Sequence, residues 1–244
     1  MAKRVLVFIV GVIIYAVFLL TNLYAIGFIG NFFVPKGIDD GVSSPFAIAM
    51  LIDLTLIAIF GLQHSLMARP VFKARWTRLI PQALERSVFV LSSSLALLLL
   101  FWQWRPIPGY VWDVQSGLVH VTLNALFWLG WFGVVLTTFL IDHFDLFGLR
   151  QVYLYLRGVE YTSVPFKKPA LYNYIRHPMM LAFLIAFWAT PQMSFGRLIF
   201  AVGMTAVILV GIAFEERDLL KAHGDAYDKY RRQVSMLIPL PRKK

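Results

Sequence analysis

Cysteine is absent from the 244-residue sequence. A disulfide framework, a thiolate metal site and a cysteine nucleophile are therefore excluded. Charged residues are also scarce, at 15%, whereas 59% of the residues are hydrophobic, and so few charges cannot cover the wetted surface of a soluble domain. No G-x-G-x-x-G turn occurs either, which removes the dinucleotide-binding fold of soluble enzymes from consideration.

Long apolar runs are present instead. They are about 17 to 25 residues long, the length that a helix needs to cross about 30 Å of hydrocarbon. Stretches such as 95–101 and 207–214 are apolar on every side, so the alternating pattern of a membrane β-barrel is excluded. The sequence predicts an all-α, polytopic membrane helical bundle of about six spans, at residues 5–29, 46–67, 87–104, 118–141, 179–192 and 198–214.

The basic residues gather between alternate spans, although the formal net charge is +10. They cluster at residues 3–4, 69–86, 150–176 and 217–244, whereas the intervening loops hold only Lys36, Arg105 and Arg197. Because cytoplasmic loops of membrane proteins are rich in lysine and arginine, we expect both termini to face the cytoplasm. The positive charge is then explained by the membrane topology and by contact with lipid headgroups, and no nucleic-acid partner is expected.

The second span carries polar residues whose burial in lipid costs free energy, so their presence requires an explanation. Asp53 and His64 lie eleven residues apart and so share one helix face, with Gln63 beside the histidine. Asp53 is equally well explained by helix packing and by function. His64 is near the predicted cytoplasmic end and is a candidate for a site role.

A histidine flanked by two acids follows the fourth span, in the segment Asp142-His143-Phe144-Asp145. The segment could be a solvated loop at the headgroups. However, Phe144 and the nearby Phe147 would hold it against the membrane, where desolvation shifts titration. A histidine beside carboxylates is a typical acid–base arrangement, so the segment is predicted to be functional.

The predicted last two spans are joined by only a short turn at residues 191–197 and should form an antiparallel hairpin. Arg176-His177-Pro178 precede the first span of this hairpin, and Glu215-Glu216 end the second. The four charged or titratable side chains should therefore converge on the cytoplasmic side. Adjacent helix residues point about 100° apart, so at most one of the two glutamates should face inward.

These motifs resemble a known superfamily. Arg176-His177-Pro178 and Glu215-Glu216, with Leu219, Tyr227, Tyr230 and Pro239, are similar to isoprenylcysteine carboxyl methyltransferases and phospholipid methyltransferases over roughly the last 75 residues. Segments 61–69 and 143–150 resemble the branch that contains NnrU-like proteins and bacterial methanethiol S-methyltransferases. One departure is Met179-Met180, where many superfamily members carry an aromatic residue after the proline.

The resemblance implies a single membrane methyltransferase domain over 1–244, with a four-span part at 5–141 and a cofactor-binding part at 142–244. It also implies that S-adenosylmethionine binds at the cytoplasmic end of the last hairpin. Glutamate suits its ammonium, arginine or histidine its carboxylate, and tyrosine its adenine. The predicted cofactor residues are Tyr172, Tyr174, Arg176, His177, Pro178, Glu215 and Glu216.

The implied reaction is methyl transfer to a small thiol, in its sharpest form methanethiol to dimethyl sulfide. Because a small thiol is mostly protonated at neutral pH, a base is useful. His143 is the predicted base, aided by Asp142 or Asp145, and His64 is the next candidate. A substrate pocket is predicted from Gln63, Trp131, Phe144, Phe147 and Arg150.

Two other readings stay open at this point. One is methylation of a prenylcysteine carboxylate or a lipid amine. The other is a non-catalytic NnrU-like protein in which His64, His120 and His143 bind haem or support an electron-transfer partner. The preferred reading has the small thiol and membrane lipid as partners, with no metal and no obligate protein partner.

Overall fold

A computed structural model describes residues 1–162 and 170–239, and these form two compact units. The first unit comprises Met1–Pro108 with Asp142–Pro165, and the second comprises Gly109–Ile141 with Phe166–Lys244. Five helical stretches in the described residues are long and apolar enough to cross a membrane: Ala2–Gly30, Phe46–Met67, Gln82–Gln103, Gly117–Ile141 and Phe195–Gln233. The chain is therefore an integral membrane protein, and the predicted helical bundle is confirmed.

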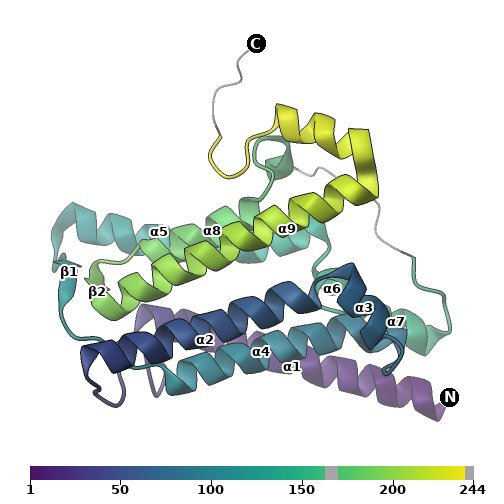
Figure 1. Ribbon diagram of the computed structural model, residues 1–244, viewed down its shortest axis with the longest axis horizontal. Coiled ribbons are helices and arrows are strands. Elements are labelled where there is room, and N and C mark those ends of the chain that lie inside the picture. The colour runs from purple at the N-terminus through teal and green to yellow at the C-terminus, as the bar shows by residue number, and fades with distance from the viewer. Residues whose placement is uncertain (163–169, 240–244) are drawn as a thin grey trace. The chain divides into compact units, whose positions relative to one another are not determined.

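In the first unit, α4 (Glu85–Gln103) packs against both α1 (Ala2–Gly30) and α2 (Phe46–Met67). α1 ends at Asn31, which has a φ of 61°, a left-handed conformation that asparagine tolerates. α2 ends just before Arg69-Pro70, because a proline disfavours helical backbone in the residue before it. Figure 1 shows the short elements α3 (Pro70–Trp76), α6 (His143–Leu146) and α7 (Leu149–Arg157) at the end of this unit where the chain begins.

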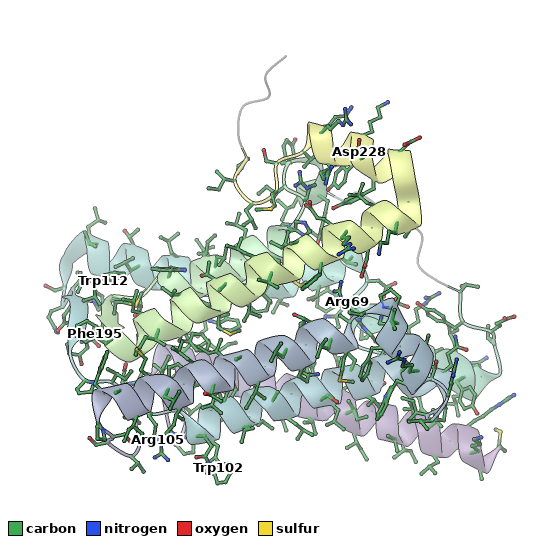
Figure 2. All side chains as sticks on the ribbon, viewed as in Figure 1. Arg69, Trp102, Arg105, Trp112, Phe195 and Asp228 are labelled. Carbon is green, nitrogen blue, oxygen red and sulfur yellow. The ribbon has the colours of Figure 1, made fainter. Side chains whose placement is uncertain are left out.

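Labelled residues mark the two ends of the first unit. Arg69 lies at the end that carries the short helices, and Trp102 and Arg105 lie at the opposite end (Figure 2). α1 has 29 residues, about 44 Å at 1.5 Å per residue, which is longer than the hydrocarbon layer of about 30 Å. Its first turns pack on α7, where a β-carbon on Gly11 would lie 2.7 Å from the buried Val152.

In the second unit, α5 (Gly117–Ile141) packs closely on α8 (Pro178–Trp188), and α8 packs on α9 (Phe195–Gln233). The approach is close because the contact residues are small. A β-carbon on Gly130 would lie 2.6 Å from the backbone nitrogen of Ala186 and 2.9 Å from the carbonyl oxygen of Ala182. Small residues at such contacts allow two membrane helices to approach backbone to backbone.

The predicted span at 179–192 is too long, because α8 ends at Trp188. Its 11 residues cover only about 16 Å. The chain then becomes extended as β2 (Gln192–Ser194), which pairs antiparallel with β1 (Tyr110–Asp113). The predicted tight helical turn at 191–197 is thus partly a strand, held by a hydrogen bond of 2.9 Å from Trp112 Nε1 to the carbonyl oxygen of Thr190. In Figure 2, Trp112 and Phe195 mark this end of the second unit, and Asp228 marks the other.

α9 continues well beyond the predicted span at 198–214 and ends at Gln233. Gly224 breaks it with a φ of 51° and a ψ of −128°, a conformation that favours glycine. The chain after the break returns to the start of α8, where Ile175 and Ser235 form a parallel bridge. Residues 163–169, with Lys167 and Lys168, and the last five residues of the predicted basic tail lie outside the described residues.

The other boundaries agree closely with the sequence. The predicted spans at 5–29, 46–67, 87–104 and 118–141 correspond to α1, α2, α4 and α5 within three residues at each end. The contacts group α6 and α7 with the first unit and α5 with the second. The predicted single domain with its division after residue 141 stays a prediction.

Candidate functional site

Arg176 and Glu216 form the centre of a buried polar cluster in the second unit. Arg176 Nε donates to Glu216 Oε1 over 2.7 Å, and the two side chains are 10% and 13% exposed. Arg176 Nη1 donates to the carbonyl oxygens of Arg231 and Val234, at 2.8 and 2.5 Å. The arginine therefore joins the start of α8 to α9 on both sides of the break at Gly224.

His177 lies beside this ion pair, at the cap position before α8, and is buried. Its Nε2 is 3.0 Å from Glu216 Oε1, and its Nδ1 is 3.7 Å from Glu215 Oε2. Glu215 is 49% exposed, so Glu216 is the glutamate that faces inward. The structure thus brings together the four side chains that were predicted to converge, and their role in binding a cofactor stays a prediction.

The predicted tyrosines border the same cluster differently. Tyr172, in η2 (Ala170–Asn173), is half-buried, and its carbonyl oxygen accepts a hydrogen bond of 2.6 Å from Tyr230. Burial raises the pKa of the Tyr172 phenol well above its usual range, and the negative charge of Glu215 adds to this effect. Tyr174 is exposed, and Pro178 is the first residue of α8. Tyr172 is therefore the better placed tyrosine to flank a ligand beside Glu215.

His143 is buried in the first unit, at the start of α6. Its Nε2 lies 2.6 Å from the hydroxyl of Tyr15, in α1. The rings of Phe144 and Phe147 meet it edge-on, at centroid distances of 5.4 and 4.9 Å. Burial lowers the pKa of His143, and the negative charge of Asp142 offsets part of this shift. The imidazole is consequently neutral near pH 7, as a base requires.

The two acids beside His143 stabilise the short helix α6 and the turn after it. The Asp142 carboxylate caps α6 by accepting a hydrogen bond of 3.1 Å from the backbone N–H of Asp145. Asp145 accepts hydrogen bonds from Arg150 at 2.8 Å and from Tyr161 at 3.3 Å. Arg150 also donates to the carbonyl oxygen of Thr162. Asp145 and Arg150 therefore brace the turn that presents His143.

The polar residues of α2 lie at two different depths. His64 is placed between the rings of Phe60 and Phe89, and its Nδ1 is 3.2 Å from the Ser93 hydroxyl. Asp53 is completely buried and accepts a hydrogen bond of 2.9 Å from the backbone N–H of Arg105. Asp53 therefore fixes the chain after α4, which agrees with the packing interpretation.

The predicted substrate residues are divided between the units. Trp131 belongs to the second unit, where its ring meets Phe183 and Phe187 of α8. Phe144 and Phe147 belong to the first unit, and Gln63 donates to Met67 Sδ over 3.2 Å there. His120 of the second unit is 2.8 Å from the carbonyl oxygen of Val114. A shared pocket from these residues stays a prediction.

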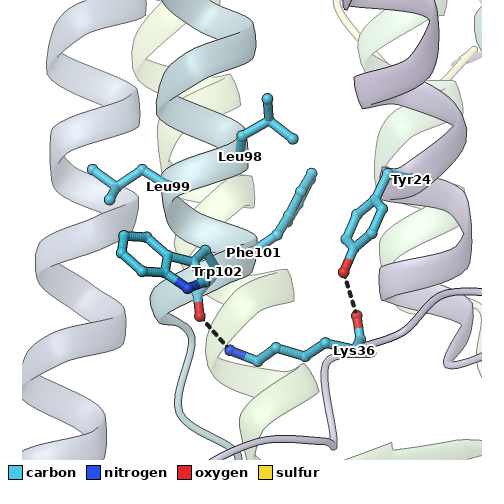
Figure 3. Close-up of a pocket in the computed structure, with 6 residues that line it drawn as sticks. All are labelled: Tyr24, Lys36, Leu98, Leu99, Phe101 and Trp102. Carbon is cyan, nitrogen blue, oxygen red and sulfur yellow. Dashed lines mark hydrogen bonds between the residues drawn. The ribbon is translucent and has the colours of Figure 1, made fainter.

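Figure 3 shows a pocket in the first unit. It is bordered by α1, α4 and Lys36, whose ammonium donates to the carbonyl oxygens of Trp102 and Trp104. Its lining residues are Tyr24, Lys36, Leu98, Leu99, Phe101 and Trp102. It includes no predicted site residue and is located at the end of the unit marked by Trp102 and Arg105 in Figure 2.

The structure adds site residues that the sequence reasoning missed. Tyr15 contacts His143, Tyr161 contacts Asp145, and Ser93 contacts His64. Each of these residues makes its contact through an uncharged hydroxyl group, whereas a sequence pattern draws attention to charged residues and histidines. Within residues 1–162 and 170–239 no group of three or more histidines, aspartates and glutamates is arranged to bind a metal ion.

Comparison with known proteins gives a consistent result. The chain is 53% identical to a methanethiol S-methyltransferase of Mycobacterium tuberculosis over 98% of both chains. It is 50% identical to methanethiol S-methyltransferase 2 of Bradyrhizobium diazoefficiens, over 98% of this chain and 92% of the relative. It is also 31% identical to Nurim of Sus scrofa, over 68% of this chain and 66% of Nurim. No protein-family model and no solved structure matches the chain.

Proposed function

The chain belongs to the family of methanethiol S-methyltransferases, and we propose that it transfers a methyl group from S-adenosylmethionine to methanethiol, giving dimethyl sulfide. The methyl donor binds at the cluster of Arg176, His177, Glu215 and Glu216. We place this cluster and both termini on the cytoplasmic side of a bacterial inner membrane. The observation that carries the proposal is the meeting of opposite charges from the segment before α8 and from α9, about 40 residues apart in the chain.

The cluster fits the amino-acid part of the donor, which carries one ammonium and one carboxylate. Glu216 already accepts from Arg176 and His177, whereas Glu215 is half exposed. Glu215 is therefore the group for the ammonium. In the described part of the chain, Arg176 uses Nε and Nη1 for protein partners and makes no hydrogen bond through Nη2. Nη2 keeps two N–H groups for the carboxylate.

S-adenosylmethionine, when bound, supplies an electrophilic methyl group on a sulfonium. The residues of the chain must supply a deprotonated thiol and a dry environment, because charge disappears as a thiolate meets a sulfonium. We assign the proton of the thiol to His143, which is neutral, buried and in edge-on contact with the rings of Phe144 and Phe147.

One parallel assay tests the proposal. Purified full-length protein receives S-adenosylmethionine labelled on its methyl group together with methanethiol, hydrogen sulfide, a prenylcysteine analogue or phosphatidylethanolamine. We expect labelled dimethyl sulfide by gas chromatography from the methanethiol sample and no labelled lipid. Labelled prenylcysteine ester or labelled phospholipid, with no dimethyl sulfide, would overturn the assignment of the acceptor. No calorimetric binding of S-adenosylmethionine would overturn the assignment of the donor.

A further inference from the structure

Tyr15 and His143 share a hydrogen bond whose direction depends on the imidazole tautomer. Tyr15 Oη and His143 Nε2 are 2.6 Å apart, and a phenol can either donate to an imidazole nitrogen or accept from it. In the tautomer with the ring proton on Nδ1, Nε2 is unprotonated and the phenol donates to it.

A hydrogen bond donated by Tyr15 limits how His143 can act as a base. In the neutral imidazole only the unprotonated nitrogen can accept a proton, and Tyr15 occupies that nitrogen. A thiol proton can reach it only if Tyr15 moves away or passes the proton on. Movement is restricted, because the Tyr15 ring also meets the ring of Phe18, and Phe18 packs on Phe147 at a centroid distance of 4.0 Å.

We propose that Tyr15 is a further catalytic residue, whose hydroxyl contacts the thiol and relays its proton to His143. The inference rests on the proposed function, since it concerns the same thiol and the same base. Tyr15 is half-buried on α1, and its ring meets the imidazole of His143 edge-on at a centroid distance of 5.8 Å, as the rings of Phe144 and Phe147 also do at 5.4 and 4.9 Å. The hydroxyl of Tyr15 is thus a polar group through which a small thiol approaches the buried imidazole.

The relay breaks and forms bonds in a balanced way. The S–H bond of the thiol breaks and its proton forms a new O–H bond with Tyr15 Oη. At the same time the original O–H bond of Tyr15 breaks and that proton forms an N–H bond at His143 Nε2. Tyr15 is unchanged, His143 becomes an imidazolium, and the thiol becomes a thiolate. The imidazolium later returns its proton to solvent.

Tyr15→Phe tests the relay, with Tyr24→Phe as the matched control. Both changes remove one hydroxyl from α1, and Tyr24 donates instead to the carbonyl oxygen of Lys36, nearer the C-terminal end of the helix. A thiol with a pKa of 8.5 or more is at most about 3% ionised at pH 7. We therefore expect Tyr15→Phe to reduce methanethiol turnover at pH 7 by about 30-fold or more, and Tyr24→Phe to retain it.

The pH dependence separates a relay from a structural role. Without the relay the enzyme must use thiolate from solution, so the turnover of Tyr15→Phe should rise about tenfold per pH unit up to the pKa of the thiol. Turnover by the unchanged enzyme should vary little over that range. The double variant Tyr15→Phe with His143→Ala should lose no more than either single variant, because the two residues act as a unit.

Two results would overturn the relay, and a third would overturn the proposed function instead. Unchanged or faster turnover by Tyr15→Phe would overturn the relay, because it would mean that His143 takes the proton directly once Nε2 is released. A loss of turnover with no rescue at high pH would also overturn it. Calorimetric binding of S-adenosylmethionine to each variant shows that the fold is intact. If the unchanged protein forms no dimethyl sulfide, it is the proposed function that fails and not the role of Tyr15 within it.

Discussion

The two adjacent glutamates of α9 should respond in opposite ways to the same substitution. Glu216 is 13% exposed, accepts a hydrogen bond from Arg176 over 2.7 Å and lies 3.0 Å from His177 Nε2. Glu215 is 49% exposed and lies 3.7 Å from His177 Nδ1. We predict that Glu216→Gln mainly lowers stability, whereas Glu215→Gln mainly lowers the affinity for the methyl donor.

The size of each effect follows from burial. A hydrogen bond to a charged group contributes about 1.5 to 3 kcal/mol. Glu216 makes two such contacts, and glutamine keeps one acceptor oxygen, so we expect a loss of about 2 to 4 kcal/mol in the free energy of unfolding. For a chain of this length that is a fall of about 5 to 15 °C in Tm. The half-exposed Glu215 is screened by solvent, so its replacement should change Tm by no more than about 3 °C.

The affinities should show the reverse order. If Glu215 holds the ammonium of S-adenosylmethionine, its neutralisation removes a charge-assisted contact and should raise Kd by about tenfold, or 1.4 kcal/mol. Thermal unfolding and calorimetric titration of both purified variants measure the two quantities. An unchanged Tm for Glu216→Gln would refute the structural role of the buried pair. An unchanged Kd for Glu215→Gln would refute the assignment of the ammonium.

Two further predictions concern the base and the helix contact. Burial lowers the pKa of His143, so the rate of methyl transfer should fall at a lower pH than an ordinary histidine base would give, as His143 becomes protonated. Asp142→Asn should move this fall to still lower pH in a pH–rate profile, because it removes the negative charge that raises the pKa of His143 while asparagine still caps α6. Gly130→Ala should cost about 1 to 3 kcal/mol in a thermal unfolding assay, because its β-carbon would overlap the backbone of Ala186. Gly211→Ala, where no atom lies within 4 Å, should not destabilise the protein, and equal losses in the two variants would contradict the close contact of α5 and α8.

The long spans could be predicted because their length is set by the membrane. α1, α2, α4 and α5 are apolar over enough residues to cross the hydrocarbon, and no partner is needed to specify them. The end of α8 could not be predicted in this way. It depends on β2 pairing with β1, about 80 residues earlier, and a strand of three residues leaves no periodic pattern.

The cluster of Arg176, His177, Glu215 and Glu216 could also be predicted only in part. The meeting of Arg176 with Glu216 follows from two antiparallel helices and the cost of unpaired charge near lipid. The carbonyl partners of Arg176 at Arg231 and Val234 do not follow from it. They require the break at Gly224, and a single glycine in a polar helix is too weak a signal to fix the direction of the chain after it.

Tyr15 explains why a base was easier to predict than its partner. A histidine next to two acids is costly at a membrane surface unless it has a function or a partner, so His143 attracts attention from the sequence alone. A phenol costs little in the same place, because its ring is apolar and its hydroxyl can reach a polar group or the interface. Its presence in α1 therefore predicts nothing until the residue facing it is known, and that residue is 128 positions away in the chain. Hydroxyls facing a predicted base from another span are for this reason the first residues to test once a fold is available.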